Sequence, residues 1–197
     1  MSSDIKVHEL EIDTGPDGAY YIIPPNTSVY RGDTTAYVRG GDEIPATPTF
    51  FGVKPGYVKN YGLVNAYVTT KPLRLLALDK PKENQSLYNH ATANIRKILD
   101  RNYGFQTGLR DTDYKQDHEL VKHLCKKGYD GYFIGRMSVA RDAIVQPYED
   151  DSDDDNITEA PKFHAEMAIC DPKSTLSKRS AQKDDIKYTA KQIEDAV

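Results

Sequence analysis

The chain has 197 residues, of which 38% are hydrophobic, and this length fits one ordinary domain that buries most of its apolar surface. The formal net charge is -4, from 26 basic and 30 acidic residues, which excludes an overall positive field that would attract nucleic acid or an anionic membrane. Residues 1–13 carry charges and lack the apolar core of a signal peptide, and no apolar run is long enough to span a bilayer. We therefore expect a soluble, cytoplasmic protein without a membrane partner.

The sequence contains two cysteines, Cys125 and Cys170. Two are too few for a disulfide framework, and they lack the Cys-x-x-Cys spacing of metal or redox sites. Both are predicted to be small, buried apolar residues. A reducing compartment is the simpler interpretation and agrees with a cytoplasmic location.

The first quarter of the chain is predicted to be extended. Apolar residues at a spacing of two within residues 5–12 indicate a strand or hairpin arm, and residues 13–18 carry a turn signal. Two further extended segments follow at 20–23 and 28–32, separated by two prolines. After a loop rich in glycine and proline, the β-prone residues 49–53 predict another strand.

The middle of the chain is predicted to contain a helical turn over 54–62, two strands, and two helices. The second of the strands, over 72–79, contains four leucines, a pattern typical of a strand buried on both faces. Apolar residues recur at three and four over 84–101, which predicts an amphipathic helix ending before Gly104. A second helix is predicted over 114–127.

A tight turn and an aromatic strand follow, and then the acidic run 149–156, which is predicted to be a solvated loop because its charges repel one another. Its alternate aspartates resemble a calcium loop, but Asn156 stands at the glycine position and Lys162 replaces the closing glutamate. We expect one domain over residues 1–176, which includes this loop. Residues 177–197 are predicted to form a polar tail or a short helix.

Residues 163–169 alternate between apolar and mixed side chains, which predicts a strand. A period of two places His164 and Glu166 on the same side, roughly 7 Å apart along the strand. Two ionisable side chains facing one way indicate the lining of a cleft. The alternative is an ordinary strand with one face in water.

The order of three motifs resembles the ADP-ribosyltransferase family, and within it the arginine, serine, glutamate subgroup. The motifs are VYRG at 29–32, TPTFFGVKPGYVKNYG at 47–62, and FHAE at 163–166 followed by Asp-Pro. The resemblance extends over residues 28–176. It implies an α+β fold in which two small, mainly antiparallel sheets surround an NAD-binding cleft, with helices between them.

The resemblance also implies site residues. Those that would bind NAD are Arg31, Gly32, Thr47, Thr49, Phe50, Phe51 and Tyr61. The guanidinium of Arg31 would bind the diphosphate or ribose oxygens, and the two phenylalanines would offer a wall on which nicotinamide stacks.

The catalytic residues would be Glu166 and His164. Breaking the bond between nicotinamide and ribose builds positive charge on the sugar, which the Glu166 carboxylate would stabilise. His164, near the incoming nucleophile, would orient or deprotonate it. Because His164 stands where the family usually has Glu or Gln, the acceptor is left open among protein, nucleic acid and small molecule.

Three alternatives remain on the sequence alone. One is removal of an RNA 2'-phosphate with NAD as acceptor, which needs basic residues for the RNA. Another is a non-catalytic interaction module, in which 14 tyrosines supply binding area and the acidic run attracts a basic partner. The last is metal catalysis, but no His-x-x-x-His pair is present, and no metal site is predicted.

Overall fold

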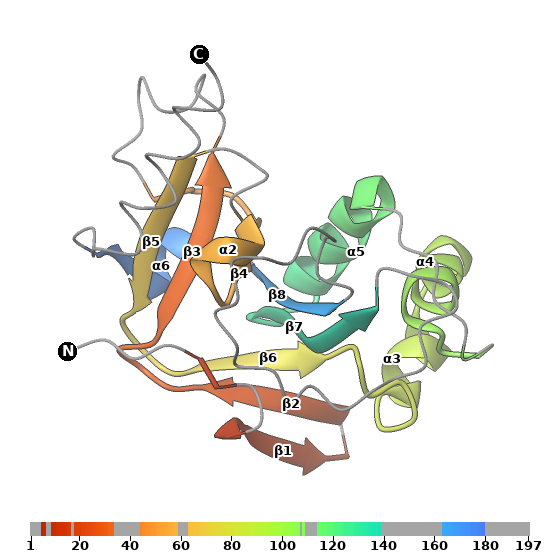
Figure 1. Cartoon of the computed structure of the whole chain (residues 1–197). Helices are drawn as coiled ribbons and strands as arrows, with labels where there is room; N and C mark the ends of the chain where they lie inside the picture. The colour runs from red at the N-terminus through yellow and green to blue at the C-terminus, as the bar shows by residue number, and fades with distance from the viewer. Residues whose placement is uncertain are drawn as a thin grey trace.

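The computed structural model describes residues 5–6, 9–16, 18–33, 44–58, 63–106, 108, 114–138 and 163–179. In these ranges the chain forms nine strands and five α-helices (Figure 1). The strands are β1 (Glu11–Gly15), β2 (Gly18–Ile23), β3 (Ser28–Asp33), β4 (Thr49–Gly52), β5 (Leu63–Thr69), β6 (Leu73–Ala77), β7 (Gly131–Ser138), β8 (Phe163–Ile169) and β9 (Leu176–Lys178). The helices are α2 (Pro55–Val58), α3 (Gln85–His90), α4 (Ala93–Tyr103), α5 (Tyr114–Lys126) and α6 (Pro172–Thr175).

The strands form one curled sheet in the order β1-β2-β6-β7-β8-β4-β3-β5-β9, and only β6 and β7 pair in parallel. In Figure 1 β3 and β5 stand at a steep angle to β2 and β6, so the sheet changes direction between its two halves. The two halves meet where β3 pairs with β4, and this pairing consists of the single residue pair Tyr30 and Gly52. The predicted α+β class is confirmed. The two predicted sheets are instead continuous, because the short β4 joins both halves.

Two apolar clusters lie on opposite faces of the sheet. The helices α3, α4 and α5 cover one face and form a cluster with β2, β6, β7 and β8. The other cluster lies inside the curl, between the two halves. In β6, Leu76 faces the helices while Leu73 and Leu75 lie inside the curl, and all three are fully buried. The predicted two-faced burial of this strand is therefore confirmed.

The helical region differs from the sequence-based prediction in one place. The helix predicted over 84–101 is two helices, α3 and α4, because Ala91 has extended backbone angles and Thr92 begins a new helix. The Thr92 hydroxyl accepts a hydrogen bond from the Ile95 amide at 3.4 Å, the ordinary role of threonine at a helix start. The α4 helix ends at Gly104, which adopts the left-handed conformation. The prediction for α5 is confirmed to within one residue.

The end of the predicted domain extends further than expected. Strand β9 pairs with β5 from Leu176 to Lys178, and the Arg179 amide donates a hydrogen bond to the carbonyl of Ala66 at 3.0 Å. The first residues of the predicted tail therefore belong to the sheet. The acidic run 149–156 and the helix expected near the carboxyl terminus lie outside the described residues.

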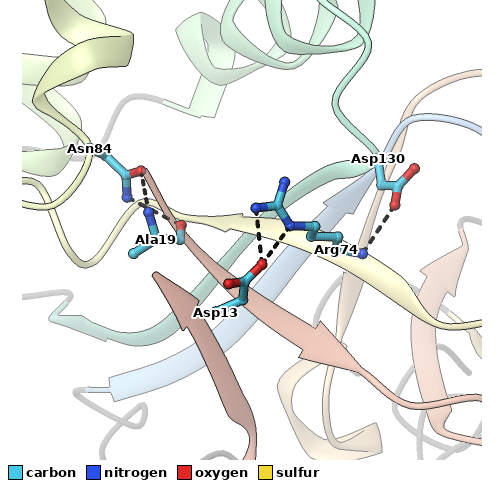
Figure 2. A network of polar contacts seen from close by, with 5 residues as sticks. All are labelled: Asp13, Ala19, Arg74, Asn84 and Asp130. Carbon is cyan, nitrogen blue, oxygen red and sulfur yellow. Dashed lines mark hydrogen bonds and ion pairs between the residues drawn. The ribbon is translucent and has the colours of Figure 1, made fainter. Parts of the chain in front are cut away.

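A buried amide ties α3 to the β1-β2 hairpin and β6. Asn84 is fully buried, and its side chain accepts a hydrogen bond from the Ala19 amide at 3.0 Å and donates one to the Ala77 carbonyl at 2.7 Å. Figure 2 shows Asn84 against Ala19, beside the ion pair of Arg74 with Asp13. A Cβ at Gly18, where φ is 127°, would overlap the Asn84 amide. The turn between β1 and β2 lies between Gly15 and Gly18, so it is shorter than the predicted span of 13–18.

We expect Asn84→Ala to lower the free energy of unfolding by about 1–3 kcal/mol, because it removes the acceptor of the buried Ala19 amide. Urea denaturation followed by circular dichroism measures the change. The matched control is Asn89→Ala, which removes an exposed amide from the same helix. Equal midpoints for the two variants would contradict this role.

The two cysteines form a disulfide, so the prediction of separate reduced thiols is wrong. Cys125 lies in the last turn of α5 and Cys170 follows β8, with their Cα atoms 5.4 Å apart. The bond joins residues 45 positions apart, a proximity that only tertiary packing creates. Disulfides persist mainly in oxidising environments, so the support for a reducing compartment is lost. In the described part of the chain, no helix is both long and apolar enough to cross a membrane.

Candidate active site

A cleft of about 670 Å³ opens between β3, β4, β8 and the helices α2 and α5. Seven of the residues predicted to form the site line it: Arg31, Gly32, Thr47, Thr49, Phe50, Phe51 and Glu166. They come from three strands and one loop that are far apart in the sequence. The volume is in the range of small-molecule sites.

Glu166 lies near the centre of β8 at the floor of the cleft. It pairs with Gly52 of β4 on one side and with Ile134 of β7 on the other, and it is 9% exposed. Directly opposed residues of antiparallel strands place their side chains on the same face. Gly52 also lines the cleft and adds no side chain beside Glu166.

Arg31 approaches this floor from β3. Its neighbour Tyr30 pairs with Gly52, and Gly52 pairs with Glu166, so the three lie in one row across three strands. Two strand spacings place the β3 backbone roughly 10 Å from that of β8. Arg31 is offset from this row by one residue, and it lines the cleft together with Glu166.

The two phenylalanines of β4 have different surroundings. Phe50 is partly buried, and the edge of its ring meets His118 of α5 at a centroid distance of 5.0 Å. The Phe51 ring packs against Tyr67 at 5.6 Å and is 2% exposed inside the curl. Both phenylalanines are lining residues of the cleft, but adjacent residues of a strand point to opposite faces, so Phe50 is the more accessible of the two rings, and the stacking of nicotinamide on them stays a prediction.

The two threonines line the cleft at the start of β4. Thr49 is 9% exposed, and its hydroxyl donates a hydrogen bond to the carbonyl of Thr47 at 2.8 Å. This bond holds the residues on either side of Pro48 in a fixed turn into the strand. The Thr49 hydroxyl oxygen keeps lone pairs for accepting a hydrogen bond from a ligand.

Sequence reasoning missed the wall formed by α5. His118, Val121 and Lys122 line the cleft, and the helix itself is correctly predicted. Their spacing of three and four places them on one flank of the helix. No local signal in the sequence indicates that this flank faces β4, since the contact depends on the disulfide and on packing.

Two predicted site residues are not placed in the cleft. His164 lies in β8, where its backbone pairs with Met137, but the position of its side chain lies outside what the structure describes. Tyr61 also lies outside the described residues. Their roles remain predictions.

A buried polar network lies behind α5. The Asp117 carboxylate, 1% exposed, accepts hydrogen bonds from the Asn102 amide at 2.8 Å and the Tyr103 hydroxyl at 3.0 Å. The Tyr103 hydroxyl also lies 3.2 Å from that of Tyr132. These bonds fix the first half of α5 against α4 and β7.

The two phenols of this network are held in their neutral form. Burial raises the pKa of Tyr103 well above its ordinary value, and the negative charges of Asp117 and Glu166 raise it further. Burial raises the pKa of Tyr132 as well, with added contributions from Tyr103 and Glu166. Both side chains therefore act as hydrogen-bond donors at neutral pH, close enough to the cleft to interact electrostatically with Glu166.

Comparisons with protein-family models, with curated proteins and with solved structures found no match. Among the described residues, no group of three or more His, Cys, Asp or Glu side chains is placed to bind a metal ion.

Proposed function

We propose that the protein is an NAD-dependent ADP-ribosyltransferase with Glu166 as its catalytic carboxylate. The observation that carries the proposal is the convergence of Arg31, Phe50 and Glu166 on one cleft, from three strands far apart in the sequence. The motifs that contain these residues resemble those of the ADP-ribosyltransferase family, which predicts the same three residues at one NAD site. A chance grouping of three unrelated segments is a poorer explanation.

In the proposed reaction the bond between the ribose C1' and the nicotinamide nitrogen breaks. The electron pair stays with nicotinamide, which leaves as a neutral molecule, and the ribose gains oxocarbenium character. The Glu166 carboxylate stabilises this developing charge more strongly than it stabilises the ground state, which is the condition for catalysis. A nucleophile of the acceptor then bonds to C1' and loses its proton.

The remaining lining residues fit roles in holding the dinucleotide. The planar guanidinium of Arg31 matches the geometry of diphosphate oxygens and can bind two of them at once. The Phe50 ring offers an apolar surface for the nicotinamide. Gly32 and Gly52 line the cleft without side chains, and the absence of a Cβ lets a ligand approach a strand closely.

His164 is proposed to act on the acceptor. It stands two residues from Glu166 on the same strand, and the strand period of two predicts both residues on one face of β8. A histidine there can accept a proton from the incoming nucleophile. The chemical nature of the acceptor stays open among protein, nucleic acid and small molecule.

The direct test is to incubate the wild-type protein with NAD and measure released nicotinamide by chromatography. Release above the rate without protein supports the proposal. Binding of NAD without release indicates the alternative, a non-catalytic binding module that uses the same cleft. Absence of both binding and release from folded protein contradicts the proposal.

Replacing Arg31 by lysine tests whether the guanidinium binds the diphosphate of NAD. We expect Arg31→Lys to weaken NAD binding by about tenfold, because lysine keeps the charge and loses the two-pronged hydrogen bonding. Isothermal titration calorimetry measures the change. Arg96→Lys, at an exposed position of α4, is the control and should bind NAD as the wild type does. Equal affinities of the two variants for NAD would show that Arg31 does not bind the diphosphate.

A further inference from the structure

The α5 wall of the cleft, formed by His118, Val121 and Lys122, is held firmly at both ends. Near its start, Asp117 accepts two hydrogen bonds from α4. At its end, Cys125 is bonded to Cys170 next to β8. The helix backbone that carries these residues is therefore anchored relative to the strand that carries Glu166.

The helix presents different residues on its two sides. Its buried stripe consists of Asp117, Leu120, Val121 and Leu124. His118 and Lys122 are exposed and four residues apart, and both line the cleft. Residues at this spacing are neighbours on one helix surface. They thus present two polar groups side by side to a ligand in the cleft.

The charges of the cleft favour an anion. Among the described residues that line it, the ionisable ones apart from His118 are Arg31, Lys122 and Glu166, which sum to one positive charge. The two cations come from different walls, since Arg31 lies on β3 and Lys122 on α5. Figure 1 shows these elements on either side of β4 and β8. The cleft therefore offers a cation on each of two walls to an anionic ligand.

We propose that Lys122, assisted by His118, binds a phosphate group of a ligand that occupies the cleft. Lysine binds phosphate as a compact charge with several donors, and a neighbouring histidine adds another donor. In so far as the ligand is NAD, the inference rests on the proposed function. The phosphate belongs either to the diphosphate of the dinucleotide or to a phosphate monoester of the second substrate.

The test compares Lys122→Gln with Lys126→Gln. Lys126 lies one turn further along the same exposed helix surface and is not a lining residue of the cleft, so it is a matched control. Glutamine keeps a good helix propensity, and thermal unfolding verifies that both variants fold. The ligands for calorimetry are ADP-ribose, nicotinamide riboside, which lacks phosphate, and inorganic phosphate added to protein saturated with ADP-ribose.

We expect Lys122→Gln to weaken the binding of one phosphate-containing ligand about tenfold, the scale of one charge-assisted hydrogen bond. The affinity for nicotinamide riboside should not change. Weaker binding of ADP-ribose identifies the dinucleotide as the source of the phosphate. A loss confined to added inorganic phosphate identifies the second substrate. Equal behaviour of the two lysine variants, or no binding of either phosphate ligand by the wild type, overturns the inference.

The nicotinamide assay separates this inference from the proposed reaction. If ADP-ribose binds through Lys122 and NAD is never cleaved, the phosphate site stands and the transferase proposal fails. If NAD is cleaved and both lysine variants bind every ligand equally, the reaction stands and the phosphate site fails. Raising the salt concentration should weaken phosphate binding more in the wild type than in Lys122→Gln, because charged contacts are screened.

Discussion

Glu166→Gln should release nicotinamide from NAD at least about a hundredfold more slowly than the wild type, the scale of losing one preorganised electrostatic group. Glutamine has nearly the same shape and fills the same place between Gly52 and Ile134. It lacks the negative charge that opposes the positive charge on the ribose. The substitution therefore removes the electrostatic contribution while leaving the packing of β8 intact.

The informative measurement is the rate at saturating NAD, together with the affinity for ADP-ribose. A loss of rate with a near-constant affinity shows that the carboxylate acts in the transition state. Glu119→Gln, at an exposed position of α5, is the control and should keep the wild-type rate. A Glu166→Gln variant that retains full activity would exclude Glu166 as the stabilising carboxylate.

The strands were predictable because their signals are local. The alternation within 163–169 fixes which residues of β8 share a face, and Ala165 and Met167 do lie inside the curl while Ala168 faces the helices. The four leucines near β6 indicated burial on both faces for the same reason. A period of two is set by the backbone itself, so it is visible without knowing the partner strands.

The grouping of Arg31, Thr49 and Glu166 followed from the order of motifs and not from periodicity. Nothing local in VYRG or FHAE states that the two segments meet. They do meet because β4 pairs with both β3 and β8. This part of the site was accessible only through resemblance to a family whose motifs occur in the same order.

The features that sequence reasoning missed depend on one contact between distant segments and on one local helix cap. The α5 wall lies on the cleft because α5 is packed against α4 and β7 and bonded to Cys170. The break at Ala91 was missed because its residues continue the apolar spacing, while the Thr92 hydroxyl competes locally for the next helix start. In both cases the deciding interaction is a side-chain bond that periodicity does not report.

Removing the disulfide should have the largest effect on stability. Cys125→Ser combined with Cys170→Ser should lower the free energy of unfolding by about 2–4 kcal/mol, because the bond restricts the unfolded chain. The loop that it closes spans 45 residues, long enough for a large entropic contribution. Guanidinium denaturation of the oxidised wild type and the double variant measures the difference.

Chemical reduction of the disulfide is an independent test of its contribution to stability. Dithiothreitol should lower the unfolding midpoint of the wild type to that of the double variant and leave the double variant unchanged. It should also weaken the binding of ADP-ribose, because α5 then loses its covalent anchor to the end of β8 and Lys122 is held less firmly. If the oxidised and reduced proteins unfold at the same denaturant concentration, the bond contributes no net stability. If only ligand affinity falls, its effect is confined to the α5 wall of the cleft.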